Sequence, residues 1–144
     1  MSTEIEWSFV NALIDIKSID NFEKEKNIKI PHDLKNTIKR FNAGQPSRCI
    51  FDTDSSTGNV FGALLSFNPS DNDNIYEIFS VVNAENKSVM PFAADPFGNY
   101  LCLMNEQVVF WDHETNSTEF VAPTFSELLN KLYITEEDEE TDEN

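Results

Sequence analysis

Asp112, His113 and Glu114, in the segment WDHE, are the best candidates for catalytic side chains in the sequence. Metal hydrolases and nucleases hold divalent ions with such side chains, so a metal-dependent hydrolase is one hypothesis. On a strand, however, Asp112 and Glu114 point to one face and His113 to the other, and the three converge only if the strand has already ended. The other histidine, His32, is distant in sequence. We therefore interpret WDHE as the polar end of a strand.

Other signatures of catalysis are missing from the sequence. It has no glycine-rich phosphate loop, no HExxH zinc motif and no GxSxG nucleophile motif. Two pairs of loop acids, Asp52 with Asp54 and Asp71 with Asp73, suggest calcium, but neither has the EF-hand spacing with its closing glutamate. We therefore expect no enzymatic activity, no metal ion and no cofactor.

The formal net charge of −16 at pH 7, from 26 acidic and 10 basic residues, limits the classes of partner. Such a surface repels nucleic-acid phosphates and anionic lipids, and it attracts basic proteins, chiefly by speeding their encounter. The Lys and Arg residues are too few and too widely spread to form a nucleic-acid-binding patch. We expect a protein partner, and neither nucleic acid nor membrane.

Part of this charge is local. Seven of the acids fall within residues 135–144, which we expect to form an acidic, disordered tail, with a partner-binding segment as the alternative. The rest of the chain still carries a net charge of −9. We therefore predict a rim on the folded part where carboxylates guide a basic partner and aromatic side chains provide affinity. The predicted rim residues fall in loops or at strand ends: Asp52, Asp54, Asp71, Asp73, Asp95, Asp112 and Glu114.

The sequence favours a cytoplasmic protein. Its first residues carry acids where a secretory signal has Lys or Arg, and no apolar run reaches the roughly 18 residues of a membrane span. Cys49 and Cys102 lie in apolar surroundings without a CxxC pattern, which predicts two buried thiols. A disulfide between them stays an alternative.

Two helices are predicted in the first third of the chain. Ser18 is a candidate N-cap of a short helix that ends near Asn27. After Pro31, apolar residues at helical spacing predict a second helix that ends before Gly44. Ahead of both helices, the residues interpreted as buried are Trp7, Phe9 and, as a further candidate, Val10.

The middle of the chain changes from helical to extended patterns. Residues 49–51 and the continuous apolar run 60–67 predict two strands. The segment 74–83 predicts a helix, because its apolar residues fall at helical spacing and Asn74 and Glu77 fit a capping box.

The segment DPFGN at 95–99 predicts the turn of a hairpin. Asp95 is interpreted as an acceptor of backbone N–H groups two residues on, with a contact to a partner as the alternative. The strands of the resulting meander are predicted at 90–94, 100–104 and 107–113, with 119–122 as an edge strand.

The last segment, TFSELLNKLY, predicts a helix that begins with a capping box of Thr124 and Glu127. Helices and hairpins in this order, without βαβ crossovers, predict an α+β fold. We expect a mostly antiparallel sheet of about four to six strands with helices packed on one side. The length of 144 residues suits a single domain, 1–134, followed by the tail at 135–144.

In this order the segments resemble the SUKH superfamily, which includes the fungal Smi/Knr cell-wall regulators. The resemblance covers the chain from about Ile19 to Tyr133. Its most specific pieces are IP before the second helix, NAGQP after it, and PFAADPFGNY together with FWDHE. Many relatives have two glycines where this sequence has Ala43 and Gly44, a departure that concerns a turn.

The resemblance implies an α+β fold without known catalytic activity. For bacterial members of this size it implies an immunity protein that binds and blocks a polymorphic toxin, often a nuclease. A regulatory or scaffolding module, as in the fungal relatives, is the alternative. The family's recurring residues that match here have explanations in turns or core packing, so none is carried over as catalytic: Pro31, Gly44, Pro46, Asp95, Gly98, Asn99 and Trp111.

Overall fold

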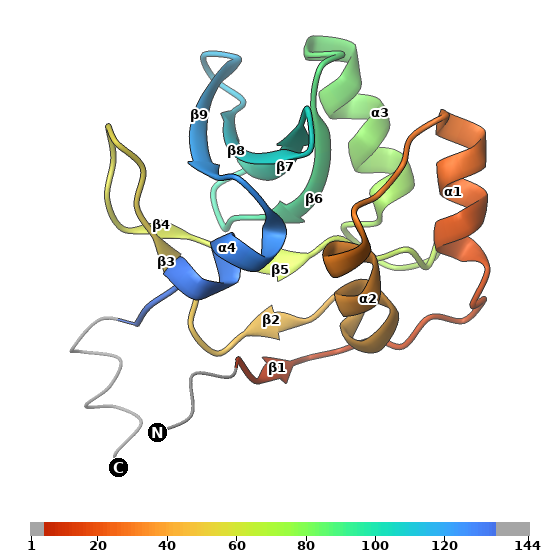
Figure 1. Ribbon diagram of the computed structural model, residues 1–144. Coiled ribbons are helices and arrows are strands. Elements are labelled where there is room, and N and C mark those ends of the chain that lie inside the picture. The colour runs from red at the N-terminus through yellow and green to blue at the C-terminus, as the bar shows by residue number, and fades with distance from the viewer. Residues whose placement is uncertain (1–4, 135–144) are drawn as a thin grey trace.

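The chain folds around a five-stranded antiparallel sheet in the computed structural model, which describes residues 5–134 (Figure 1). Strands β6 to β9 follow one another as a meander, and β5 pairs with the outer side of β6, giving the order β5-β6-β7-β8-β9. The strands span Ala63–Leu64 (β5), Met90–Ala94 (β6), Tyr100–Met104 (β7), Gln107–Asp112 (β8) and Ser117–Ala122 (β9). The predicted meander and its edge strand are confirmed.

Four helices and two small two-stranded sheets surround this sheet. The helices span Ser18–Lys26 (α1), His32–Phe41 (α2), Ile75–Glu85 (α3) and Phe125–Lys131 (α4). One small sheet pairs Trp7–Ser8 (β1) with Gln45–Pro46 (β2) across α1 and α2, and the other pairs Ile50–Phe51 (β3) with Asn59–Val60 (β4). The α+β class, with antiparallel sheets, is therefore confirmed.

Local sequence explains where the helices begin and end. The Asn74 side chain accepts the Glu77 N–H at 2.9 Å, and Thr124 accepts the Glu127 N–H at 3.1 Å, as the two capping boxes predict. The predicted cap of α1 is wrong: Ser18 is the buried first residue of that helix, and the capping position holds Lys17 without a side-chain hydrogen bond. Its predicted end near Asn27 is correct, because Asn27 takes the left-handed conformation that closes a helix.

The predicted continuous strand 60–67 is broken in two. Its first part belongs to β4, and after Gly62 the chain becomes β5 and pairs with β6 instead. A Cβ atom on Gly62 would lie 2.6 Å from the carbonyl oxygen of Ala94, so only glycine allows this close approach of two backbones. The apolar run alone does not indicate that the chain passes from one sheet to another, because apolar residues continue on both sides of Gly62.

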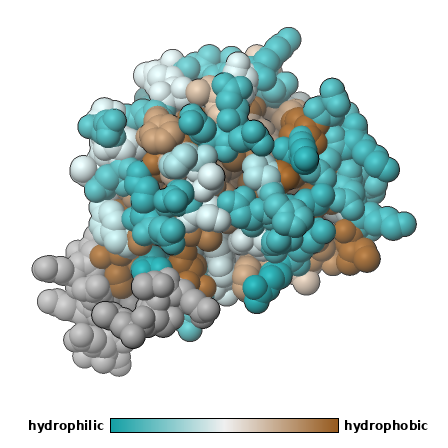
Figure 2. All heavy atoms as spheres, viewed as in Figure 1, coloured by the Kyte–Doolittle hydropathy of each residue, from teal (hydrophilic) through white to brown (hydrophobic). Residues whose placement is uncertain are grey.

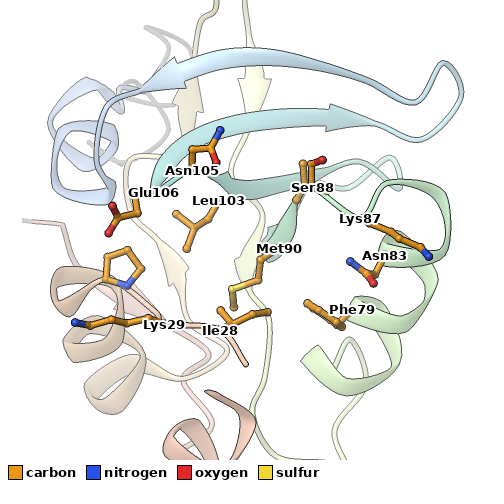
Figure 3. A pocket seen from close by; sticks show the side chains of 12 residues that line it. Ile28, Lys29, Phe79, Asn83, Lys87, Ser88, Met90, Leu103, Asn105 and Glu106 are labelled. Atoms are coloured by element: carbon orange, nitrogen blue, oxygen red, sulfur yellow. The ribbon is translucent and has the colours of Figure 1, made fainter. Parts of the chain in front are cut away.

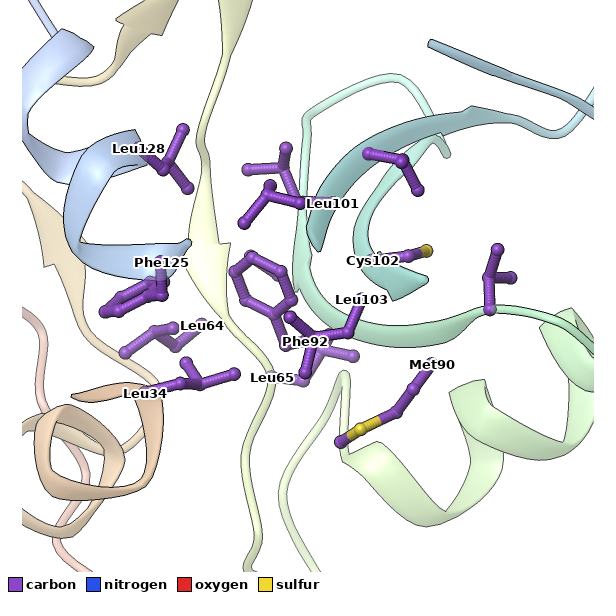
Figure 4. Close-up of a cluster of buried hydrophobic side chains, with 14 of the residues drawn as sticks. Leu34, Leu64, Leu65, Met90, Phe92, Leu101, Cys102, Leu103, Phe125 and Leu128 are labelled. Carbon is purple, nitrogen blue, oxygen red and sulfur yellow. The ribbon is translucent and has the colours of Figure 1, made fainter. Parts of the chain in front are cut away.

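Buried apolar side chains form one cluster that reaches from α1 to α4. Figure 4 shows residues of α2, β5 and α4 gathered around Phe92 and Leu101 of the sheet. The rings of Phe92 and Phe125 meet edge to face, with centroids 5.6 Å apart. In β7, Leu101 and the two residues after it are all buried, so both faces of the sheet are covered there.

The cysteines follow the prediction in part. Cys102 is a fully buried thiol of β7, and burial raises its pKa far above the ordinary value, so it is unreactive. Cys49 is only half-buried. The two are not joined by a disulfide.

The start of the described chain departs from the prediction. Trp7 is half-buried and stacks on Phe41, with ring centroids 5.7 Å apart, but Phe9 is 79% exposed and Val10 is exposed as well. Phe9 has a φ of 56°, which turns the chain so that its ring leaves the core. The expected burial of Phe9 and Val10 is therefore wrong.

No helix within residues 5–134 is long and apolar enough to cross a membrane. The predicted acidic tail, 135–144, lies outside the described residues, and so do its seven carboxylates.

Candidate functional site

Asp95 builds the turn between β6 and β7. Its Oδ1 accepts the backbone N–H groups of Phe97 and Asn99, both at 2.8 Å, and its Oδ2 accepts the side-chain amide of Asn99 at 3.3 Å. Gly98 supplies the positive φ, 88°, that this turn requires. The interpretation of Asp95 as a turn acceptor is therefore confirmed.

The turn between β8 and β9 lies directly against this first turn. Strand β8 ends at Asp112, so His113 and Glu114 are turn residues and the alternation expected for a strand does not apply to them. The Nδ1 atom of His113 lies 2.9 Å from Oδ1 of Asn99, which also accepts the His113 backbone N–H at 3.2 Å. The carboxylate of Asp112 accepts the Glu114 N–H at 2.8 Å. The polar end of β8 is thus a second turn fixed to the first.

We call residues 95–99 and 112–116 together the turn pair. It holds three of the seven predicted acids, Asp95, Asp112 and Glu114, on one end of the sheet. Phe97 belongs to the first turn, and its side chain is 73% exposed. Hydrogen bonds fix the backbone of both turns, so the backbone that carries Phe97 and the exposed Glu114 has little conformational freedom to lose on binding.

Asp52 and Asp54 lie elsewhere, in the loop between β3 and β4. Hydrogen bonds from the Gly58 N–H (2.9 Å) and the Tyr133 hydroxyl (2.7 Å) lower the pKa of Asp52. Asp54 is exposed. The same loop approaches β9, where the Ser55 and Ser56 hydroxyls donate to the Glu119 carboxylate.

Asp71 and Asp73 precede α3. The Asp71 carboxylate accepts hydrogen bonds from the Ser66 hydroxyl and the Asn11 amide, both at 2.6 Å, and from Asn68 at 3.2 Å. These bonds, that from Ser66 foremost, lower the pKa of Asp71. Asp73 is exposed. The pKa of Tyr100 is raised, chiefly because Tyr100 is partly buried and also because of the negative charges of Asp73 and Asp95. The seven predicted acids therefore form three groups, with the turn pair as the largest.

Charge along the chain is strongly segregated. Residues 49–130 carry twelve acids and one base, Lys87, whereas residues 17–48 carry eight bases and four acids. The sheet with its turns and α3 are thus acidic, and the segment with α1 and α2 is basic, while α4 carries one acid and one base. The sequence interpretation of widely spread Lys and Arg residues is wrong in this respect.

Within residues 5–134, no group of three or more His, Cys, Asp or Glu side chains is placed to hold a metal ion. The side chains that suggested metal chemistry have other neighbours. The Asp112 carboxylate accepts a backbone N–H, and the His113 ring lies against Asn99 and Gly98.

A small cleft opens between the α1–α2 connection, α3 and the β7–β8 turn, with a volume of about 190 Å³. Phe79, Met90 and Leu103 form its apolar lining, while Lys87 and Glu106 stand on opposite sides (Figure 3). Small-molecule sites usually occupy about 300 to 1,000 Å³, so this cleft is too small for most substrates. None of the seven predicted acids lines it.

Sequence reasoning missed three functional features of the turn pair: the exposed Phe97, and the contacts of Asn99 with Asp95 and His113. The one local signal was an aromatic residue at the centre of a predicted turn, a position that a core side chain rarely takes. The contact between Asn99 and His113 joins residues 14 positions apart. It depends on the pairing of β7 with β8.

Comparison with protein families gives a match. No curated protein matches the chain. The model of the SMI1 / KNR4 family (SUKH-1) matches residues 13–131, a range that includes all four helices and all of the five-stranded sheet. The resemblance of the sequence to this group is therefore confirmed, and the chain belongs to the SMI1 / KNR4 family (SUKH-1).

Proposed function

We propose that this protein is an immunity protein that binds and neutralises a basic toxin domain, a nuclease, through the acidic turn pair. Membership of the SUKH-1 family supports an immunity role in general. The observation that carries the specific proposal is the turn pair itself, where two turns joined by hydrogen bonds hold three acids and the exposed Phe97 in the acidic part of the chain.

The proposed mechanism is occlusion without chemistry. A nuclease domain binds phosphates with Lys and Arg, so its substrate surface is positive. Carboxylates on the turn pair attract that surface and orient the encounter, while Phe97 contributes affinity when its ring leaves water. Asp95, Asp112 and Glu114 then stand where substrate phosphates would bind. In this proposal the protein acts in the cytoplasm and needs neither a metal ion nor a cofactor.

The remaining predicted acids have different parts in this proposal. Asp52, Asp54, Asp71 and Asp73 extend the negative field beyond the turn pair, although two of them already accept several hydrogen bonds within the fold. Residues 135–144 add seven more negative charges. Such distant charges act on the rate of encounter and are screened by salt within about 10 Å at 0.1 M.

The test begins with the toxin domain encoded by the gene immediately upstream. The purified protein is expected to bind that domain, to abolish its nucleic-acid cleavage at equal concentration, and to associate more slowly as salt rises. Reversing a single exposed charge with Glu114→Lys is expected to slow association at low salt, roughly threefold. The matched control, Glu106→Lys, reverses an exposed acid of the β7–β8 turn, at the opposite end of the sheet, and should slow association much less.

Two outcomes would contradict the proposal. If the protein neither binds nor inhibits the neighbouring toxin domain, the immunity role is wrong. If no toxin gene adjoins it and the protein instead retains several cellular proteins, a regulatory or scaffolding module is the better description.

A further inference from the structure

We infer that a second surface contacts the same toxin domain: the strap, residues 9–16, which fits an apolar groove bordered by Lys or Arg. This inference rests on the proposed function, because it assigns the strap to the same partner. It adds a contact that holds the complex together after the acidic turn pair has guided it into place.

Apolar side chains point outward along the strap. Phe9 is 79% exposed, Val10 37%, Ile14 77% and Ile16 78%, so half of the eight large exposed apolar residues of the described chain lie in this one segment. Figure 2 shows brown side chains toward the lower right, over the segment that connects β1 to α1. Contiguous exposed apolar surface is uncommon on soluble proteins and marks interaction sites.

The strap is nevertheless fixed to the fold by buried asparagines. The main chains of Asn11 and Asn42 are joined at 2.9 Å, and the Asn42 amide also donates to the Asn11 carbonyl at 2.9 Å. Asn68 accepts the Ile14 N–H and donates to the Ala12 carbonyl, both at 2.9 Å. The polar backbone is therefore paired inward while the apolar side chains face water, so their exposure is a property of the ordered fold.

Backbone strain points the same way. Phe9 has a φ of 56°, a left-handed conformation that is an outlier for a bulky aromatic residue. The ring gains no burial in return, since most of it is exposed. An unfavourable conformation that turns an aromatic side chain into solvent is explained if that side chain is buried in a complex.

Charges beside the strap decide what kind of partner it fits. Asp15 belongs to the strap and lines a pocket with Ile14 and Glu25. Asp71 accepts the Asn11 side-chain amide at 2.6 Å. Lys17 is the one nearby base in sequence. An apolar groove with a basic border complements this surface. The positive charge of that border agrees with the basic toxin domain of the proposed function. A second copy of this chain would bring like charges together instead.

The experiment compares dissociation rates of single variants from the toxin domain encoded by the upstream gene. Ile14→Ser and Ile16→Ser are expected to raise the dissociation rate roughly tenfold each, while association at low salt changes less than about twofold. The matched control is Val81→Ser, which removes an apolar side chain of α3 that is 66% exposed; its rates should equal those of the natural chain.

A variant at Phe9 separates binding from folding. Phe9→Gly removes the ring and also relieves the positive φ, so its midpoint of urea unfolding should stay equal or rise while dissociation accelerates. A merely structural role for Phe9 would instead lower the unfolding midpoint.

Each remaining outcome overturns the inference. If the natural chain binds the toxin and the strap variants dissociate at the same rate, the strap is not a contact, although the immunity role stands. If sedimentation shows a dimer of this chain that Ile14→Ser separates, the strap is a self-association surface. If the natural chain does not bind the toxin at all, the proposed function fails and this inference fails with it.

Discussion

Asn99 holds His113 by two contacts, one to the imidazole Nδ1 at 2.9 Å and one from the backbone N–H at 3.2 Å. Asn99 in turn donates its side-chain amide to Asp95. One asparagine therefore joins the β6–β7 turn, which carries Phe97, to the β8–β9 turn. Together with Asp95, whose carboxylate accepts two backbone N–H groups, Asn99 holds the turn pair in place.

Replacing Asn99 with alanine should disconnect the two turns. Because the side chain makes three hydrogen-bond contacts, Asn99→Ala is expected to lower the free energy of unfolding by about 1 to 2 kcal/mol. Urea unfolding followed by the fluorescence of Trp111 measures the change. Asn72→Ala, in an exposed loop, is the control; equal effects of the two substitutions would show that Asn99 does not hold the turns.

Removing the carboxylate of Asp95 should destabilise the fold, because two backbone N–H groups lose their acceptor. Asp95→Ala is expected to cost about 1 to 3 kcal/mol, as for hydrogen bonds to charged groups. The exposed loop acid Asp54 provides the comparison, and Asp54→Ala should stay within about 0.5 kcal/mol. A neutral effect of Asp95→Ala in urea unfolding would argue that its carboxylate serves binding alone.

Phe97 is expected to affect binding and not folding. Its ring is 73% exposed, so Phe97→Ser should leave the unfolding midpoint unchanged while dissociation from the toxin domain accelerates roughly tenfold. Phe120→Ser is the matched control, since Phe120 is 51% exposed on β9. Surface plasmon resonance measures the dissociation rate of each variant. Equal dissociation rates for Phe97→Ser and Phe120→Ser would show that Phe97 does not contact the toxin domain.

Acid should weaken the attachment of the strap through Asp71. Its pKa is lowered in the folded protein, so its contribution to stability is complete above its ordinary value of 3.8 and is lost as the pH falls through the lower folded value. Asp71→Asn is therefore expected to lower the urea midpoint at pH 7 and to make progressively less difference as the pH falls below 3.8.

The net charge of the whole protein also changes with acid, so the comparison at each pH is between variants. Asp73→Asn, two residues away and exposed, controls for the removal of one negative charge. If Asp71→Asn and Asp73→Asn have the same pH profile, the hydrogen bonds to Asp71 contribute nothing.

Gly62 should not tolerate a side chain. A methyl group there would lie 2.6 Å from the Ala94 carbonyl oxygen, so Gly62→Ala is expected to destabilise the fold by about 1 to 3 kcal/mol as the backbones separate. Gly58 is the control because its surroundings are open and its φ is 72°, which asparagine tolerates. Thermal unfolding should show Gly58→Asn close to the natural chain, and a similar result for Gly62→Ala would contradict this account of the break between β4 and β5.

Local patterns in the sequence predicted most of the elements. The capping residues Asn74 and Thr124 act within three residues of their partners, and the turn at Asp95 is closed by its own carboxylate. Such interactions form between residues close in sequence, so they can be predicted without knowledge of the rest of the fold. For the same reason the meander could be predicted, because each of its strands pairs with the next in sequence.

Long-range relationships explain what was missed. The break at Gly62 depends on Ala94, and the attachment of the strap depends on Asn42 and Asn68. Phe9 was predicted to be buried, yet a left-handed turn places it in solvent. Sequence periodicity carries no information on contacts of this kind.

The sequence by itself determined the acidic character of the protein, its α+β class and the family to which it belongs. The reason is that net charge is a sum over residues, and helix caps and hairpin turns form between residues close in sequence. Only the tertiary structure decided which acids share a surface. It divides the seven predicted carboxylates among three groups, joins the turn of Asp95 to the turn of Asp112 and Glu114 through Asn99, and turns the apolar residues of the strap outward. The physical reason is that strand pairing and buried side-chain hydrogen bonds connect residues far apart in the chain.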